Sequence, residues 1–134
     1  MKLTKRSDYA LRMLGVLLTK EDAMPMREIA EQTNLSLKFL QQVGASLAKV
    51  GVLESLPGAK GGLRIIGRPQ DITILQVVET VEGETSLLEC MQESTSCTEF
   101  GGCQIHGILG KALFAFNEVL SKATLEDLRT CPVK

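Results

Sequence analysis

Apolar residues recur at steps of three and four along most of this 134-residue chain, which is the spacing of helices that bury one face. The clearest stripe in the first half lies over residues 36–50, behind the capping residue Ser36, and consists of Leu37, Leu40, Val43, Leu47 and Val50. A first helix is expected over residues 7–19, capped by Ser7, and a short second helix begins at Pro25. Residues 33–35 make the turn before the third helix. This order predicts a helix-turn-helix.

Alternation replaces the helical period after the third helix. Residues 52–56 and 63–66 have the pattern of two short strands, and the glycine-rich turn 57–62 joins them. A hairpin that directly follows a helix-turn-helix is the wing of a winged-helix domain, and we predict one here.

The second half of the chain returns to the helical period. A fourth helix, capped by Asp71 or Thr73, is expected to end at Gly83, and Thr124 is expected to cap a short final helix. The longest stripe lies over residues 104–121 and contains Ile105, Ile108, Leu109, Ala112, Leu113, Phe116, Val119 and Leu120. Because the helices of the first half already have partners among themselves, we interpret this stripe as a dimer interface.

The fold predicted from these patterns is mainly α. Residues 1–70 form a winged helix-turn-helix DNA-binding domain, and residues 71–134 contain a cysteine-rich segment and a long C-terminal dimerisation helix. Residues 1–68 carry 11 Lys and Arg against 6 Asp and Glu, whereas residues 69–134 carry 4 against 10, so only the first half is expected to meet a polyanion. No apolar run approaches the roughly 20 residues that span a membrane, and the N-terminus does not resemble a signal peptide, so we expect a cytoplasmic protein.

Polar and basic side chains fall where such a domain would contact double-stranded DNA. On the third helix they lie opposite the buried stripe, where Ser and Gln can hydrogen-bond base edges and Lys can neutralise phosphate. Cations near the N-terminus and at the glycine-rich hairpin tip would contact the backbone. The predicted DNA-contacting residues are Lys2, Lys5, Arg6, Ser36, Lys38, Phe39, Gln41, Gln42, Lys60, Gly61, Gly62 and Arg64. A two-fold dimer would set two such helices about one DNA turn apart, over a pseudo-palindromic operator.

Three of the four cysteines and the only histidine fall in one segment. Cys90, Cys97, Cys103 and His106 have the spacing C-x6-C-x5-C-x2-H. Thiolate and imidazole are ligands of zinc and of iron–sulfur clusters. The wide spacing favours a cluster over a Cys3His zinc site, whose cysteines are usually closer together, and over inert thiols. Cys131 lies in the terminal tail and has no assigned role.

Together these features resemble the family of bacterial regulators that contains IscR, NsrR and RirA. The resemblance rests on the N-terminal motifs Met-Lys-Leu-Thr-Lys and Asp-Tyr-Ala-Leu-Arg, the helix-turn-helix, the hairpin motif Gly-Gly-Leu-Arg-Ile, the fourth helix and the cysteine segment. It implies a homodimeric winged-helix transcription factor whose iron–sulfur cluster is ligated by Cys90, Cys97 and Cys103. The first cysteine gap is longer than is usual in that family, and Leu63 stands where an aromatic residue is common.

The resemblance also implies two candidates for the fourth ligand. His106 matches the histidine ligand of a 2Fe–2S cluster in the IscR branch. Asp8 matches a carboxylate that the opposite subunit supplies to a 4Fe–4S cluster in the NsrR branch. Because His106 lies within the cysteine segment, we prefer it and a 2Fe–2S cluster, with Asp8 and 4Fe–4S as the alternative.

The sequence therefore predicts a homodimeric transcriptional regulator whose operator affinity is controlled by a cluster that senses iron, redox or nitric oxide status. One alternative is a small iron–sulfur redox protein whose basic half docks an acidic partner. Another is a winged-helix regulator that lacks a cluster and uses zinc or thiol chemistry. An enzyme is not expected, because Cys103 and His106 have no evident third group to orient them and no oxyanion donors.

Overall fold

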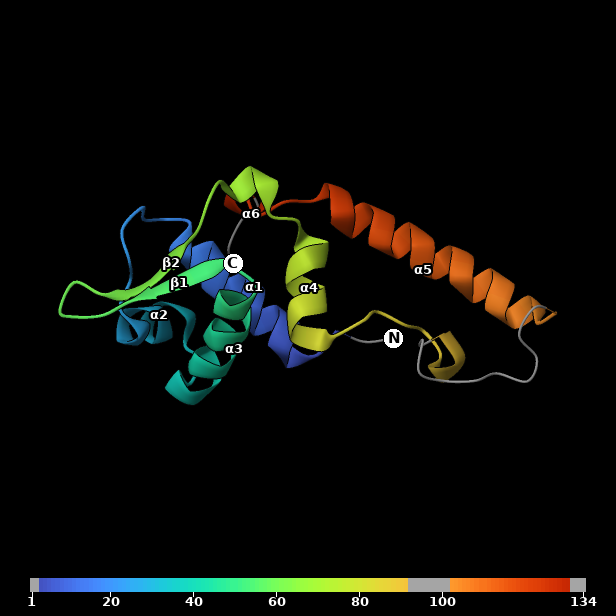
Figure 1. Ribbon diagram of the computed structural model, residues 1–134, viewed down its shortest axis with the longest axis horizontal. Coiled ribbons are helices and arrows are strands. Elements are labelled where there is room, and N and C mark those ends of the chain that lie inside the picture. Colours follow the sequence, from blue (N-terminus) through green and yellow to red (C-terminus); the bar gives the residue numbers. More distant parts are fainter. Residues whose placement is uncertain (1–2, 92–101, 131–134) are drawn as a thin grey trace.

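The helix-turn-helix and the hairpin lie at one end of the molecule, and a long helix extends toward the other end (Figure 1). The structure is a computed structural model that describes residues 3–91 and 102–130. Its elements, in order, are α1 (Lys5–Leu17), α2 (Met26–Thr33), α3 (Leu37–Lys49), β1 (Leu53–Leu56), β2 (Gly62–Ile65), η1 (Pro69–Asp71), α4 (Ile74–Glu82), η2 (Glu89–Met91), α5 (Gln104–Lys122) and α6 (Asp127–Thr130). This mainly helical fold with a two-stranded antiparallel sheet confirms the predicted fold class.

The helix starts follow the predicted caps with one exception. Ser36 and Thr73 cap α3 and α4, each accepting a hydrogen bond from the backbone N–H three residues on. Helix α1 is instead capped by Thr4, whose hydroxyl accepts from the Arg6 backbone N–H at 3.2 Å. The prediction that Ser7 caps α1 is wrong, because Ser7 lies inside the helix and is only 1% exposed.

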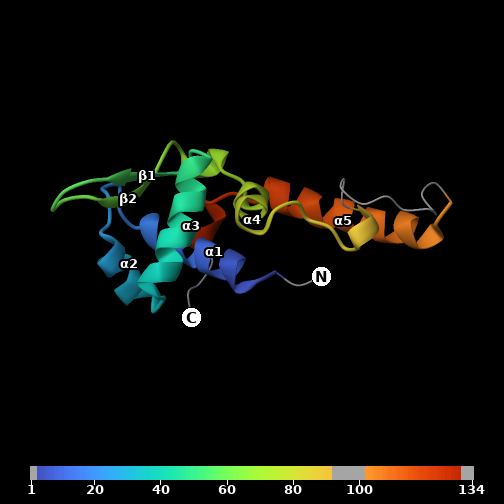
Figure 2. The same cartoon turned by 60° about the horizontal axis from the view of Figure 1, so that its bottom comes forward.

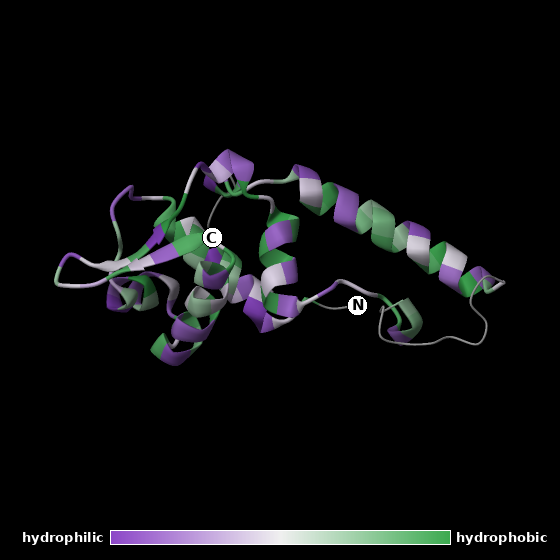
Figure 3. Cartoon of the chain, in the orientation of Figure 1, coloured by the Kyte–Doolittle hydropathy of each residue, from purple (hydrophilic) through white to green (hydrophobic). Residues whose placement is uncertain are grey.

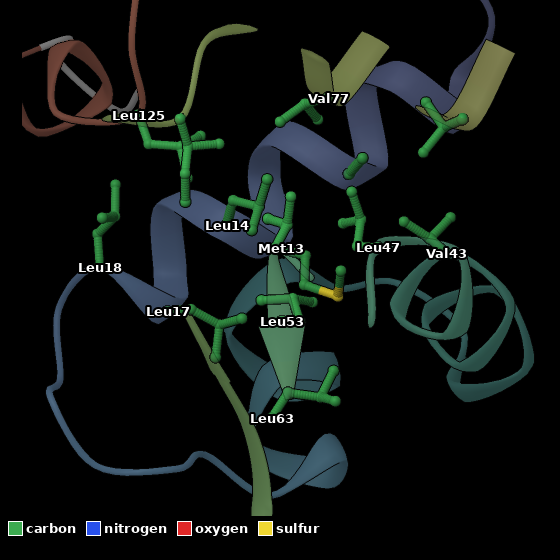
Figure 4. Close-up of a cluster of buried hydrophobic side chains, with 14 of the residues drawn as sticks. Met13, Leu14, Leu17, Leu18, Val43, Leu47, Leu53, Leu63, Val77 and Leu125 are labelled. Atoms are coloured by element: carbon green, nitrogen blue, oxygen red, sulfur yellow. The ribbon is translucent and has the colours of Figure 1, made fainter. Parts of the chain in front are cut away.

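A single hydrophobic core joins the first three helices, the hairpin and α4 (Figure 4). Met13 and Leu14 of α1 meet Leu47 of α3 and Val77 of α4, and all four are fully buried. Leu125, which follows α5, is also fully buried in this core. The core therefore draws side chains from both sides of residue 70, and the predicted domain boundary there stays a prediction.

The wing has a third backbone partner that the sequence did not indicate. Met24 lies in the connection between α1 and α2 and pairs with Leu63 of β2 through two backbone hydrogen bonds of 2.9 Å, one in each direction. Both side chains are buried. The connection between α1 and α2, which is polar at Lys20, Glu21 and Asp22, thus includes a core residue that fixes the hairpin against the helices.

Helix α5 is attached to the rest of the chain mainly at its C-terminal end. The Ile74 N–H donates to the carbonyl oxygen of Ala123 at 2.8 Å, and the Leu125 N–H donates to that of Ile72 at 2.9 Å. Thr124 pairs with Thr73, and its N–H donates to Asp127 Oδ2 at 2.8 Å, where α6 begins, so the predicted cap of the final helix by Thr124 stays a prediction. Among the described helices, none is long and apolar enough to cross a membrane.

Candidate nucleic-acid interface and metal centre

The outer face of α3 is polar and open. Its buried face consists of Leu40, Val43, Gly44 and Leu47, which pack on the core. Lys38, Gln41 and Gln42 project from the other side and are exposed. In Figure 2 this helix lies across the front of the domain, beside α2. A helix presented in this way can enter the major groove, where amide and ammonium groups contact base edges and phosphates.

Two other predicted contact residues on α3 have structural partners. The Ser36 hydroxyl accepts the Phe39 N–H at 3.3 Å as the helix cap. The Phe39 ring is half-buried and packs edge-to-face against Tyr9 of α1, with ring centroids 4.7 Å apart. The ring contact holds α3 against α1, and a role of Ser36 or Phe39 in DNA binding stays a prediction.

Ion pairing divides the cations of the basic half into two groups. Arg12, Lys20, Arg64 and Arg68 each pair with a carboxylate, namely Asp8, Glu28, Glu54 and Asp71. Within residues 3–91 and 102–130, no ion pair is formed by the exposed cations Lys5, Arg6, Arg27, Lys38, Lys49 and Lys60. Five of these six cations belong to the start of α1, to α3 and to the wing tip, which are the three places predicted to meet DNA, and the sixth, Arg27, lies on α2. Lys2 lies outside the described residues.

The wing glycines have a structural explanation. A β-carbon at Gly61 would lie 2.7 Å from the Pro57 carbonyl carbon, and one at Gly62 would lie 2.6 Å from the Pro25 nitrogen. Both glycines therefore let backbone segments approach one another. Gly61 is buried, whereas Lys60 beside it is exposed at the tip. Lys60 is thus an exposed cation at the tip of the wing, and its contact with a phosphate stays a prediction.

The described residues of the cysteine segment lie at the end of the molecule opposite the wing. Cys90 lies in η2, Cys103 is the N-cap of α5 and His106 lies in the first turn of α5, and all three are half-buried. Figures 1 and 2 both show η2 and the start of α5 at that end. Cys97 lies outside the described residues.

The donor chemistry of this segment fits a metal centre. Cys90 and Cys103 carry thiols and form no disulfide within the described residues. Cys103 occupies an N-cap position, which Ser, Thr, Asp or Asn usually fills, yet its side chain makes no capping hydrogen bond. Local helix stability therefore gives no reason for a cysteine there. Two thiols and an imidazole are donors that suit an iron–sulfur cluster or zinc.

A complete ligand set is not assembled within the described part of the chain, where no group of three or more His, Cys, Asp or Glu residues is arranged to hold a metal ion. The alternative ligand Asp8 is exposed on α1, and its Oδ1 accepts a hydrogen bond from Arg12 Nε at 2.9 Å. An exposed carboxylate in this position is accessible to a second subunit.

One carboxylate near the cysteine segment was missed by sequence reasoning. Oε1 of Glu82, the last residue of α4, accepts hydrogen bonds from the Thr4 N–H at 2.8 Å, the Thr4 hydroxyl at 2.6 Å and the Ser7 hydroxyl at 2.7 Å. Partial burial raises the pKa of Glu82, but the hydrogen bonds from Thr4 and Ser7 outweigh this effect, and the pKa lies below its ordinary value. The sequence holds no local signal of this contact, because Ser7 lies 75 residues and Thr4 lies 78 residues from Glu82 along the chain.

Known proteins share both the sequence and the fold. Residues 3–130 match the family model Rrf2, described as an iron-dependent transcriptional regulator. The chain is 35% identical over 133 residues to the HTH-type transcriptional regulator NsrR of Halalkalibacterium halodurans, an alignment that covers 97% of this chain and 91% of the relative.

Solved structures of regulators have a similar fold. The fold is similar to that of CymR, the global cysteine regulator of B. subtilis, with a TM-score of 0.79, 28% identity and 97% of each chain covered. It is also similar to T. potens IscR, with a TM-score of 0.72, 25% identity and coverage of 96% of this chain and 85% of that one. The NsrR relative and CymR are regulators by name, and neither is an enzyme.

Proposed function

The chain belongs to the Rrf2 family of transcriptional regulators, and from that premise we propose that it is a homodimeric operator-binding protein controlled by an iron–sulfur cluster. The observation that supports this most directly is the distribution of unpaired cations. Lys5, Lys38 and Lys60 come from three separate elements, and none forms an ion pair among the described residues, although four other cations of the same half do. Unpaired cations beside an exposed polar helix suit a surface that binds a polyanion.

Helix α5 supports the homodimer. No residue of this 19-residue helix is buried. Ile105, Ile108 and Val119 are 62%, 68% and 67% exposed, and Figure 3 shows apolar positions along the whole helix. Large apolar side chains in a row on one helix favour association with a second helix. The half-buried Leu109, Leu113, Phe116 and Leu120 lie on the neighbouring face.

The cluster would be held by Cys90, Cys97, Cys103 and His106, with Asp8 of the second subunit as the alternative fourth ligand. A 2Fe–2S cluster bound there would supply chemistry that responds to iron supply, oxidation or nitric oxide. The chain's own contribution is to place the ligands at the ends of two elements. Cys90 follows α4 by a short connection, and Cys103 caps α5.

The fourth ligand is testable by two substitutions. His106→Ala is expected to alter the visible absorption of the purified protein and to shorten the life of the cluster in air, whereas Asp8→Ala leaves both unchanged. The opposite result would assign the ligand to Asp8. Unchanged spectra in both variants would exclude both residues.

The proposed function is tested by anaerobic purification followed by DNA titration. We expect a brown protein with comparable iron and sulfide, and different affinities of the holo and apo forms for a pseudo-palindromic operator at fixed salt. A colourless protein with stoichiometric zinc, or without metal after reconstitution, would refute the cluster and leave a regulator that uses zinc or thiols. Equal affinities of a genuine holo form and its apo form would refute control by the cluster.

A further inference from the structure

Glu82 connects the end of the helix that precedes the cysteine segment to the start of the helix that carries the N-terminal cations. It is the last residue of α4, and Cys90 follows it by eight residues. Its partners Thr4 and Ser7 lie on either side of Lys5 and Arg6. The contact thus joins the helix before the cysteine segment, which is proposed to hold the cluster, to the start of α1, which is proposed to contact DNA.

The contact of Glu82 with Thr4 and Ser7 is expected to be strong because it concentrates several hydrogen bonds on one carboxylate oxygen. One carboxylate oxygen accepts three hydrogen bonds of 2.6–2.8 Å, and hydrogen bonds to an ionised acceptor are stronger than those between neutral groups. The oxygen also lies at the N-terminus of α1, where the helix dipole favours negative charge. Ser7 is the buried polar side chain of the described core, and Glu82 is its hydrogen-bond acceptor. Without Glu82, its hydroxyl would lose that partner in an apolar setting.

The connection between Glu82 and Cys90 has a second anchoring contact. The Thr85 hydroxyl donates to Oδ1 of Asn117 on α5 at 3.0 Å. The connection that leads to Cys90 is therefore held at Glu82 against α1 and at Thr85 against α5. A rearrangement that moves Cys90 relative to α4 would act on these two contacts, and only the Glu82 contact leads to residues predicted to meet DNA.

We propose that Glu82 is the positioning residue that couples the state of the cysteine segment to the DNA-contacting N-terminus of α1. The inference rests on the proposed function, because it presumes that the cysteine segment has two states. In one state Oε1 holds Thr4 and Ser7, and Lys5 and Arg6 are fixed on the first turn of α1. In the other state the end of α4 shifts, and this turn is released.

Glu82→Ala tests the coupling, and Glu79→Ala is its matched control. Glu79 lies on the same helix, carries the same charge and is exposed, with no side-chain hydrogen bond in the described part of the structure. In the wild type and the control we expect holo and apo forms to differ in operator affinity by about tenfold or more, a usual size for coupling between two sites. In E82A we expect the ratio to fall to about one while the cluster's absorption is retained.

The ratio of the operator affinities of the holo and apo forms distinguishes coupling by Glu82 from a purely structural role. A structural role alone would weaken both forms by the same factor and leave the ratio unchanged, and that result would overturn the inference. If the wild type itself shows no difference between holo and apo forms, the proposed function fails first and this inference fails with it. If the wild type shows the difference and E82A keeps it, only the inference fails.

A second measurement needs no cluster. In apo protein, tryptic cleavage after Lys5 and Arg6 requires the first turn of α1 to open. Because E82A removes hydrogen bonds that hold this turn closed, cleavage there should become about tenfold faster, with no change in the Glu79→Ala control. Equal cleavage rates in E82A and wild type would overturn the inference.

A milder variant keeps the test valid if E82A does not fold. Glu82→Gln keeps the side-chain shape and one carbonyl oxygen but removes the charge, so it should give intermediate values of the affinity ratio and the cleavage rate. Wild-type values of both quantities in E82Q, together with an E82A protein that does not fold, would overturn the coupling and leave Glu82 as a core support.

Discussion

Replacing Gly62 with alanine would force apart two backbone segments that meet at the base of the wing. Gly62 has a φ of 138°, and a β-carbon there would lie 2.6 Å from the Pro25 nitrogen and closer still to the Met24 carbonyl oxygen. That oxygen accepts the Leu63 N–H, and the Met24 N–H donates to Leu63 in return. Since a backbone oxygen cannot yield as a flexible side chain can, the strand must separate from Met24.

The cost can be worked from these contacts. Loss of the two hydrogen bonds between Met24 and Leu63 costs about 1 kcal/mol each. An L-residue at positive φ adds about 1–2 kcal/mol. The free energy of unfolding of Gly62→Ala should therefore fall by about 3–4 kcal/mol, and its melting temperature by about 10–15 °C for a chain of this size.

Two other glycines of the same turn serve as controls. Gly58 also has positive φ, at 95°, but a β-carbon there meets nothing within 4 Å. Gly58→Ala should cost only about 1 kcal/mol, because the strain is partly offset by the lower entropy of the unfolded chain. At Gly61 a β-carbon would lie 2.7 Å from the Pro57 carbonyl carbon, without a positive φ, so Gly61→Ala should fall between the other two variants.

The assay is thermal unfolding followed by circular dichroism at one protein concentration, because a dimer's melting temperature depends on concentration. Operator binding is measured on the same samples. If Gly62→Ala melted within about 3 °C of the wild type but lost operator binding, the glycine would serve DNA contact and not the pairing with Met24, and the reasoning would be refuted.

Three further predictions concern other surfaces. Ile108→Glu places a charge at a 68%-exposed apolar position of α5 and should shift the protein from dimer to monomer in sedimentation velocity, while Lys111→Glu on the same helix should not. Lys38→Ala should weaken binding to all DNA sequences similarly and reduce the slope of log Kd against log salt by about 0.9, as expected for one lost phosphate contact. Glu82→Gln should destabilise the protein at neutral pH, because the folded-state pKa of Glu82 is depressed and its contribution is complete above the ordinary pKa of 4.5. As pH falls below that value through the lowered pKa, the difference in melting temperature between E82Q and wild type should disappear; a constant difference down to acid pH would contradict the assignment.

The helices and strands could be predicted from the sequence because each has a local signal. The stripe of Leu40, Val43 and Leu47 has the helical period, and Ser36 precedes it as a capping residue. Strands β1 and β2 were recognisable from their alternation and the glycine-rich turn between them. In each case the residues that decide the structure lie within a few positions of one another.

The errors and omissions arise where a side chain is held by a partner far along the chain. Ser7 has the composition of a helix cap, yet it is buried and donates to Glu82, 75 residues away. Met24 lies in a polar stretch, yet it pairs with Leu63. The two wing glycines matched a phosphate-binding turn, and the structure shows that close backbone packing also requires them. Sequence patterns contain no information on such distant pairings.

Two routes lead from the cysteine segment to the DNA-contacting face, and they differ in length and in what holds them. One runs along α5, whose 19 residues span about 28 Å between Cys103 and the attachment near Ala123. None of the residues of α5 is buried within one chain, so in the proposed homodimer this route would depend on the second subunit to fix the helix. The other runs from Cys90 back over eight residues to Glu82 and crosses to Thr4 by hydrogen bonds of 2.8 Å or less. Because the second route is short and lies within one chain, the proposed coupling would carry a change at Cys90 to the first turn of α1 without any change in the proposed dimer. In the proposed homodimer, the spacing of the two α3 helices and the hold on the N-terminal cations would therefore respond separately to the proposed cluster signal.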